Sequence, residues 1–314
     1  MTTAMTNLLT GNRWWIYQRE RFPLVAHGPL IFAFSFSAVS FSALLRGHDG
    51  WPAGPSLAVA FLTSLLFFLQ LRIADEFKDA GEDAKYRPYR PVPRGLVRLR
   101  ELGVIGVAGA LVQLMLAWWL YAPLLILLAV TWLYLALMSH EFFARDWLKA
   151  RPVTYLWTHM LIMPLIDLYA TACDWLLQGQ TPPAGLHWFL IVSFFNGIVI
   201  EIGRKLRAPE AEERGVETYT VLWGRARAVT AWLAALTVTG VFAVIAAQRI
   251  GWHWPMAALL SVPLGYALWL GVTFVREPTT VRGQRLELLS GVWTLVLYLG
   301  LGAAPMLWRA LAGG

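Results

Sequence analysis

The sequence has few charged residues and a single cysteine. Only 14% of its 314 residues are charged and 58% are hydrophobic, whereas soluble domains carry about 25% charge. The one cysteine, Cys173, excludes an internal disulfide, and we expect it to act as a small apolar residue. The first 20 residues lack an apolar core followed by a small-residue cleavage site, so no removable signal peptide is expected. The scarcity of charge predicts a protein that lies mainly in lipid.

Long apolar runs occupy most of the chain. A hydrocarbon core of about 30 Å requires roughly 20 apolar residues in a helix, and the alternating segments of a membrane β-barrel are absent from the sequence. We therefore predict an all-α, polytopic membrane protein with one domain over residues 1–314 and nine transmembrane helices. The predicted helices are 23–45, 55–74, 101–120, 123–140, 152–173, 184–203, 226–247, 254–275 and 287–309.

Basic residues predict the orientation of these helices. With a cytoplasmic N-terminus, the outer loops and C-terminal tail hold only Arg46, Arg249 and Arg309 of the 26 Lys and Arg residues, as the positive-inside rule requires. We therefore expect a multi-pass protein of the cell inner membrane with its C-terminus outside. The net charge of +7 follows from this topology, and no nucleic-acid partner is expected. The predicted cytoplasmic loops are 75–100, 141–151, 204–225 and 276–286.

Three aspartates follow the second predicted helix at four-residue intervals. On a helix, Asp75, Asp79 and Asp83 would lie on one face, where neighbouring carboxylates about 6 Å apart repel by roughly 1–3 kcal/mol per pair. A cation is therefore expected, and oxygen ligands without a His or Cys cluster favour Mg²⁺ bridging to a diphosphate. A solvated helix end, in which nearby lysines pair with Glu82, is the alternative that the spacing leaves open.

The segment after the aspartates is rich in arginine and proline. Prolines between positions 88 and 93 stiffen a loop that carries Arg87, Arg90 and Arg94. Guanidinium groups match the geometry of phosphate oxygens. The loop therefore favours a diphosphate site over a solvated helix end.

At this point the sequence resembles a known family. The motif Asp75-x3-Asp79-x3-Asp83 with a downstream Arg90-Pro-Val-Pro-Arg-Gly is similar to the first signature of the UbiA-type intramembrane prenyltransferase superfamily. Asp79 and Asp83 match family aspartates, whereas Asp75 stands where the family most often has asparagine. The resemblance implies nine helices around a central cavity that opens to the lipid. It also implies Mg²⁺-dependent transfer of a prenyl group from a polyprenyl diphosphate to an aromatic or other lipophilic acceptor.

The second family signature, at the inner end of the sixth predicted helix, is only partly present. Lys205 and Ala208 stand where the family has its two central aspartates. The sequence therefore leaves open whether carboxylates bind a second Mg²⁺ here. A lysine ammonium offers its positive charge directly to a phosphate in place of a metal. The matching positions are Glu201, Arg204, Gly215 and Thr218, with one residue fewer before the glycine. The candidate ligands that remain for a cation bound through water are Glu201, Glu210 and Glu212.

The loop at 141–151 resembles the basic family loop that contacts the diphosphate, and Lys149 and Arg151 are its candidates. The positive-inside bias accounts for both residues equally well. The resemblance thus implies three overlapping sets of site residues: catalytic residues, substrate-binding residues and Mg²⁺ ligands. The expected catalytic residues are Asp79, Asp83, Lys149 and Lys205. The expected substrate-binding residues are Arg72, Asp75, Arg87, Arg90, Arg151, Glu201 and Arg204. The expected Mg²⁺ ligands are Asp75, Asp79, Asp83 and Glu201.

Two polar residues fall inside the fifth predicted helix. Asp167 is expected to face inward, because an ionisable group in lipid costs about 3 kcal/mol or more, and a structural hydrogen bond to another helix is favoured over an acceptor contact. His159 is expected to be a packed polar residue, since no second histidine lies at ligand spacing.

Three other functions stay open. A membrane terpene cyclase of the same superfamily would use the same ionisation without an external acceptor. A transporter would need charges inside its helices and two half-repeats; central charges are few, although 72–94 and 201–224 resemble each other loosely. A scaffold that has lost catalysis is consistent with Lys205 and Ala208. The partners predicted are a polyprenyl diphosphate, a lipophilic acceptor and membrane lipid.

Overall fold

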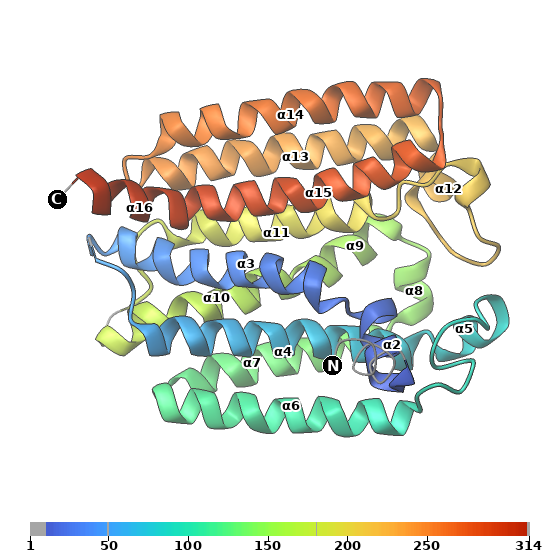
Figure 1. Cartoon of the computed structure of the whole chain (residues 1–314), viewed down its shortest axis with the longest axis horizontal. Coiled ribbons are helices and arrows are strands. Elements are labelled where there is room, and N and C mark those ends of the chain that lie inside the picture. Colours follow the sequence, from blue (N-terminus) through green and yellow to red (C-terminus); the bar gives the residue numbers. More distant parts are fainter. Residues whose placement is uncertain (1–10, 49, 180, 313–314) are drawn as a thin grey trace, which may run out of the picture.

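Helices dominate the computed structural model, which describes residues 11–48, 50–179 and 181–312 (Figure 1). No strand occurs in these residues, so the all-α prediction is confirmed. In this part of the chain, eight helical segments are long and apolar enough to cross a membrane. The fourth predicted helix, 123–140, is not among these eight; it corresponds to Leu124–Ser139, whose 16 residues rise about 24 Å, somewhat less than the hydrocarbon thickness.

The long helices follow the predicted order. They are α3 (Leu24–Leu45), α4 (Gly54–Lys78), α6 (Leu99–Leu120), α7 (Leu124–Ser139), α9 and α10 (Pro152–Met160 and Ile162–Trp175), α11 (Leu186–Gly203), α13 (Arg225–Gln248), α14 (His253–Arg276) and α15 (Thr280–Leu301). Figure 1 shows α6 and α7 on one side of the bundle and α13 and α14 on the other, with α3, α4 and α10 between them.

Short helices gather at one end of the bundle. These are α2 (Arg13–Arg21), α5 (Ala80–Tyr86), α8 (Arg145–Lys149) and α12 (Tyr219–Trp223). The helix α16 (Ala303–Ala312) lies at the opposite end (Figure 1). The predicted cytoplasmic loops therefore meet at one end, which we call the acidic end because it carries Asp75, Asp79 and Asp83.

Two predicted helices differ from the observed ones in their limits. The helix predicted at 287–309 begins seven residues earlier, because the Thr279 hydroxyl accepts a hydrogen bond from the Arg282 N–H (3.3 Å) and caps α15. It ends before Gly302, where an added side chain would collide with the backbone of Ser37 on α3. The helix predicted at 152–173 is divided into α9 and α10, which meet at Leu161.

Interhelical hydrogen bonds hold polar side chains inside the bundle. The Gln113 amide of α6 accepts from Gln70 of α4 (2.9 Å) and from the Trp132 indole of α7 (3.0 Å). It also donates to the backbone carbonyl of Thr63 (3.1 Å). Gln113 is fully buried, and lipid would offer these groups no partner. One glutamine therefore joins three helices.

The polar residues of α10 serve packing. Asp167 is fully buried and accepts a hydrogen bond from the Tyr298 hydroxyl of α15 (2.9 Å), so the expected structural bond to another helix is confirmed. Towards the other end of the helix, Asp174 pairs with Arg46 (2.6 Å). Cys173 is a free, buried thiol, as expected of a small apolar residue.

Replacing Gln113 by leucine is expected to destabilise the protein by about 1–2 kcal/mol, because the Gln70 amide and the Trp132 indole lose their shared acceptor. Gln248→Leu, at the exposed end of α13, is the matched control and should change stability little. Unfolding of both variants in detergent checks this. Equal stabilities for the two variants would contradict a structural role for Gln113.

Candidate functional site

The acidic motif spans the end of α4 and the whole of α5. α4 ends at Lys78, Asp79 lies in a kink (φ −93°, ψ 2°), and α5 begins at Ala80. The N–H groups of Asp79 and Asp83 still donate to the carbonyls four residues before them (2.9 and 2.8 Å). The three aspartates therefore keep helical spacing, but across a kink instead of along one straight helix.

Asp83 is almost fully buried and carries its own counterions. Arg87 Nη2 lies 2.9 Å and Arg90 Nη1 2.7 Å from its two carboxylate oxygens. Both arginines are predicted to bind substrate, and in this structure they also neutralise Asp83. An aspartate with two guanidinium partners has little need of a further cation.

Asp75 and Asp79 are less well compensated. Asp75 has Arg72 and Lys78 only at 3.5 and 3.8 Å. The Asp79 side chain forms no hydrogen bond or ion pair with any residue that the structure describes. Burial, followed by the negative charge of Asp75, raises the pKa of Asp79 above its usual value. A cation placed at Asp79 would therefore relieve both causes.

Asp75 and Asp79 fit the way in which Mg²⁺ binds with phosphates. Among the described residues, no three His, Cys, Asp or Glu side chains gather into a ready-made metal cluster. Mg²⁺, however, usually takes one or two carboxylates and completes its shell with water and substrate phosphates. Asp83 and Glu201, the other predicted ligands, each already hold two basic side chains.

Glu201 organises the second motif at the end of α11. Its carboxylate pairs with Arg204 (2.6 Å) and Lys205 (2.9 Å). The charge of Glu201 raises the pKa of the Arg204 guanidinium, and Asp75 adds to this effect. Lys205 also lies over the Tyr219 ring, 5.5 Å from its centre. The ends of α4 and α11 therefore lie within electrostatic reach of each other.

The other two candidate glutamates stabilise the segment after α11. Glu210 accepts hydrogen bonds from the N–H (2.9 Å) and hydroxyl (3.0 Å) of Thr280 at the start of α15. Glu212 accepts from the hydroxyls of Thr218 (2.8 Å) and Thr220 (2.6 Å). These contacts give both glutamates a structural role.

The loops that follow α4 and α11 contact each other. The Tyr86 ring packs against Gly215, whose φ of +76° and close approach leave no room for a side chain. The Tyr89 hydroxyl donates to Glu213 (2.6 Å). The glycine predicted from the second motif thus serves to bring the two motif-bearing loops together.

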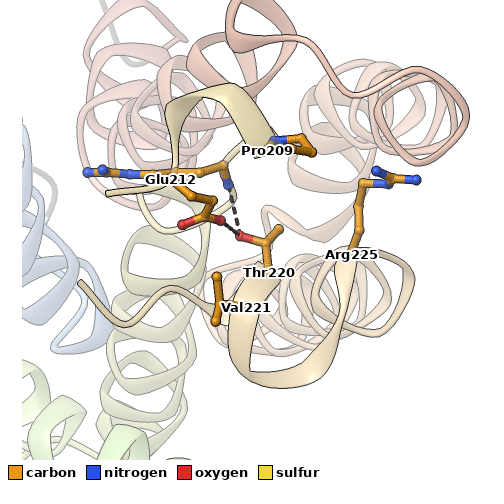
Figure 2. A pocket seen from close by; sticks show the side chains of 6 residues that line it. Pro209, Glu212, Thr220, Val221 and Arg225 are labelled. Carbon is orange, nitrogen blue, oxygen red and sulfur yellow. Dashed lines mark hydrogen bonds between the residues drawn. The ribbon is translucent and has the colours of Figure 1, made fainter. Parts of the chain in front are cut away.

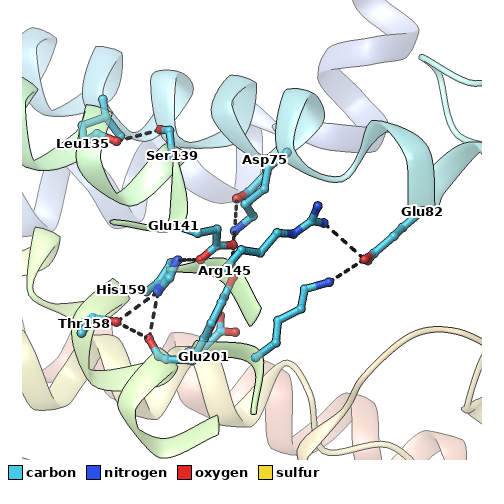
Figure 3. Close-up of polar contacts among 12 residues, drawn as sticks. Asp75, Glu82, Leu135, Ser139, Glu141, Arg145, Thr158, His159 and Glu201 are labelled. Carbon is cyan, nitrogen blue, oxygen red and sulfur yellow. Dashed lines mark hydrogen bonds and ion pairs between the residues drawn. The ribbon is translucent and has the colours of Figure 1, made fainter. Parts of the chain in front are cut away.

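The basic loop before α9 reaches the acidic segment through one of its two predicted residues. Lys149 lies 2.6 Å from Glu82 and Arg145 lies 3.5 Å from it; Figure 3 shows Arg145 directed towards Glu82. The hydrogen bond from Lys149 lowers the pKa of Glu82. Arg151 instead stacks on Trp147 (4.4 Å) and donates to its carbonyl (3.1 Å). The structure therefore brings Lys149, and not Arg151, to the acidic segment, at Glu82.

A buried polar cluster beside Asp75 was not predicted from the sequence. Glu141 accepts from Tyr155 (3.1 Å) and lies 3.2 Å from the ring nitrogen of His159 (Figure 3). Lys78 lies 2.8 Å from the Tyr155 hydroxyl and 3.4 Å from Glu141. Burial would raise the pKa of Glu141, but the His159 hydrogen bond and the Lys78 charge together lower it to about 2. The expectation that His159 is a packed polar residue is confirmed.

Backbone strain lies next to this cluster. Glu141, Phe142 and Phe143 all have positive φ (51°, 51° and 58°), a region that non-glycine residues enter at a cost of about 1 kcal/mol or more each. The sequence did contain one signal that could have indicated the cluster. Tyr155 and His159 are four residues apart, which places both on one face of α9. No pattern in the sequence indicated the strained turn.

Comparisons with known proteins agree with this architecture. The model of the UbiA prenyltransferase family matches residues 33–296. The apo structure of a UbiA homologue from Aeropyrum pernix K1 is similar with a TM-score of 0.65 and 13% identity, over 86% of this chain and 96% of that one. A UbiA homologue from Archaeoglobus fulgidus bound to DMAPP and Mg²⁺ is similar with a TM-score of 0.54 and 13% identity, over 91% of this chain and 98% of that one.

A structure described as that of a digeranylgeranylglyceryl phosphate synthase in membranes is also similar, with a TM-score of 0.58 and 12% identity over 90% of this chain and 98% of that one. No curated protein sequence matches the chain. At such low identities the solved structures establish the fold alone. The family model covers well over half of the chain, and on that ground this membrane protein belongs to the UbiA prenyltransferase family.

Proposed function

We propose that this protein is a Mg²⁺-dependent prenyltransferase that moves a prenyl group from a polyprenyl diphosphate to an aromatic or other lipophilic acceptor. The observation that carries the proposal is the uncompensated Asp79, next to Asp75, at a bundle end otherwise supplied with cations. A related protein of this fold was solved with DMAPP and Mg²⁺, which supports the same type of donor and metal here.

In the proposed reaction, Asp75 and Asp79 would hold the metal, which would supply positive charge to the phosphate oxygens. The bond between the first prenyl carbon and the diphosphate oxygen breaks, and its electron pair leaves with the diphosphate. The acceptor then forms a bond to that carbon and loses a proton. Charge that is already in place at the departing group lowers the barrier, because it needs no reorganisation.

Basic side chains are proposed to complete the diphosphate site. Lys205 stands where the family has an aspartate, and its ammonium would contact phosphate directly, so we propose one Mg²⁺ at this site. Glu201 positions Lys205 and Arg204, as Asp83 positions Arg87 and Arg90. Asp83 and Glu201 are thus proposed as positioning residues, with Lys149 steadying the segment through Glu82.

The membrane location suits the substrate. A long isoprenoid tail gains about 0.8 kcal/mol for each CH₂ kept out of water, so the tail would lie among the helices with its diphosphate at the acidic end. We further propose that this end faces the cytoplasm of the inner membrane, with the C-terminus outside. The basic residues are concentrated at this end, as the positive-inside rule requires.

The direct test is to incubate the purified protein with Mg²⁺ and prenyl diphosphates of several lengths, with and without candidate lipophilic acceptors. Diphosphate release with a prenylated acceptor supports the proposal. Release of a cyclised hydrocarbon without an acceptor would identify a terpene cyclase instead. No metal-dependent release with any chain length would contradict both functions.

Asp79→Asn is expected to lower the transfer rate by about 10²- to 10³-fold, because the metal loses a charged ligand. Stability should change by less than about 0.5 kcal/mol, since the Asp79 side chain has no hydrogen bond or ion pair to lose among the described residues. Asp146→Asn is the matched control, because Asp146 is exposed at the same end and forms no ion pair with a described residue. Steady-state rates across a Mg²⁺ titration measure the effect, and a wild-type rate for Asp79→Asn would refute the metal site.

Asp83→Asn is expected to act differently, through folding. It leaves Arg87 and Arg90 without their shared carboxylate, and these side chains are only 11% and 19% exposed. Loss of about 2 kcal/mol of stability should accompany loss of activity. Unfolding of Asp83→Asn and Asp79→Asn side by side tests the distinction, which fails if both variants are equally stable.

Lys205→Met is expected to raise the KM for the prenyl diphosphate by about tenfold, because one charge-assisted contact to phosphate disappears. Lys85→Met serves as the control, since Lys85 is exposed and its ammonium lies over the Tyr86 ring (4.9 Å) without an ion pair to any described residue. The factor by which kcat falls should be smaller than the factor by which the KM rises. An unchanged KM for Lys205→Met would show that this lysine only balances Glu201.

A further inference from the structure

A basic hollow lies at the acidic end, at the start of α13 (Figure 2). Its volume is about 420 Å³. Its lining comes from the segment after α11, from α12 and from the first residue of α13. The lining residues are Arg207, Pro209, Glu212, Thr220, Val221 and Arg225.

The unbalanced charge in this hollow belongs to Arg225. Its side chain forms no hydrogen bond or ion pair with any residue that the structure describes, and its buried Nε–H has no acceptor. Arg207 shares its charge with Glu213 (3.2 Å). The Glu212 carboxylate in the wall already accepts from Thr220 (2.6 Å). The hollow therefore presents a guanidinium group that has no anion of its own.

An apolar groove of about 210 Å³ begins beside this hollow, because its wall includes Ala226, the residue after Arg225. The groove runs between α13 and α14, and its walls are largely aliphatic, with Val229 and Val272 among them. Val272 is 39% exposed on the lipid-facing surface. Arg276 lines the groove as well and forms no ion pair with a described residue.

We propose that the hollow and the groove together bind an anionic phospholipid from the leaflet at the acidic end. Its phosphate would lie between Arg225 and Arg276, and an acyl chain would fill the groove. Two unpaired guanidinium groups complement a phosphate, and an aliphatic groove beside them matches the chain attached to it. A free phosphate would leave the groove empty. No residue proposed to handle Mg²⁺ or diphosphate lines either part, so this site is separate from the proposed reaction.

Binding is tested with the full-length protein in detergent by native mass spectrometry. Phosphatidylglycerol and phosphatidylcholine are offered separately, and glycerophosphoglycerol, the head group without its chains, is offered as a competitor. The wild-type protein should prefer phosphatidylglycerol. Arg225→Gln combined with Arg276→Gln should weaken its binding by about 30-fold, because each basic residue near an anionic head group contributes about fivefold. Val272→Trp, which fills the groove, should weaken it as well.

Two matched controls decide between this site and general surface charge. Arg227→Gln changes an exposed arginine of α13 that lines neither the hollow nor the groove. Val262→Trp adds a tryptophan to the exposed surface of α14 outside the groove. Both should bind phosphatidylglycerol as the wild type does. The proposal is overturned if Arg227→Gln weakens binding as much as the double variant, or if the double variant binds normally. It is also overturned if glycerophosphoglycerol competes as well as the intact lipid. Unfolding temperatures measured without anionic lipid check that every variant is folded.

Discussion

The balance of charge at the acidic end governs how this protein holds its buried carboxylates. Carboxylates beside a bilayer are expensive to bury unless a cation accompanies them. Asp79, which is partly buried, has no hydrogen-bonding or ionic partner among the described residues. Glu76 pairs with Arg21, Asp83 with two arginines, and Glu201 with Arg204 and Lys205. The negative charge of Asp79, which no described basic side chain pairs with, thus marks a site for an external cation.

The same rule shapes the interior. Several polar side chains between the helices take their partner from another helix, as Asp167 does from Tyr298 and Gln70 from Gln113, whereas small hydroxyls such as that of Thr239 bond a carbonyl of their own helix. These bonds fix how the helices lie against one another. The helix ends, and with them the motif-bearing loops, are therefore carried to one end of the bundle by contacts that lie far from the site.

Helix positions and motif identities could be predicted from the sequence, because hydrophobic length and the spacing of acids are local properties. The partners of the aspartates could not. Asp79 and Asp83 have the same spacing and equal standing in the motif, yet only Asp83 meets Arg87 and Arg90, which depends on how the loop after α5 folds back. The Glu141 cluster was missed for the same reason, since it joins three segments that are distant in sequence.

The substitution of Lys205 for a family aspartate follows the same logic of charge. In this chain Glu201 is shared by Arg204 and Lys205, so the end of α11 carries one more positive charge than negative. A second metal held by aspartates would bring positive charge to the same place. A lysine provides it permanently and without a metal-binding equilibrium, although as a single point charge instead of a divalent ion. The end of α11 therefore suits direct contact with an anion, and the end of α4, where Asp79 stays uncompensated, suits contact through a metal.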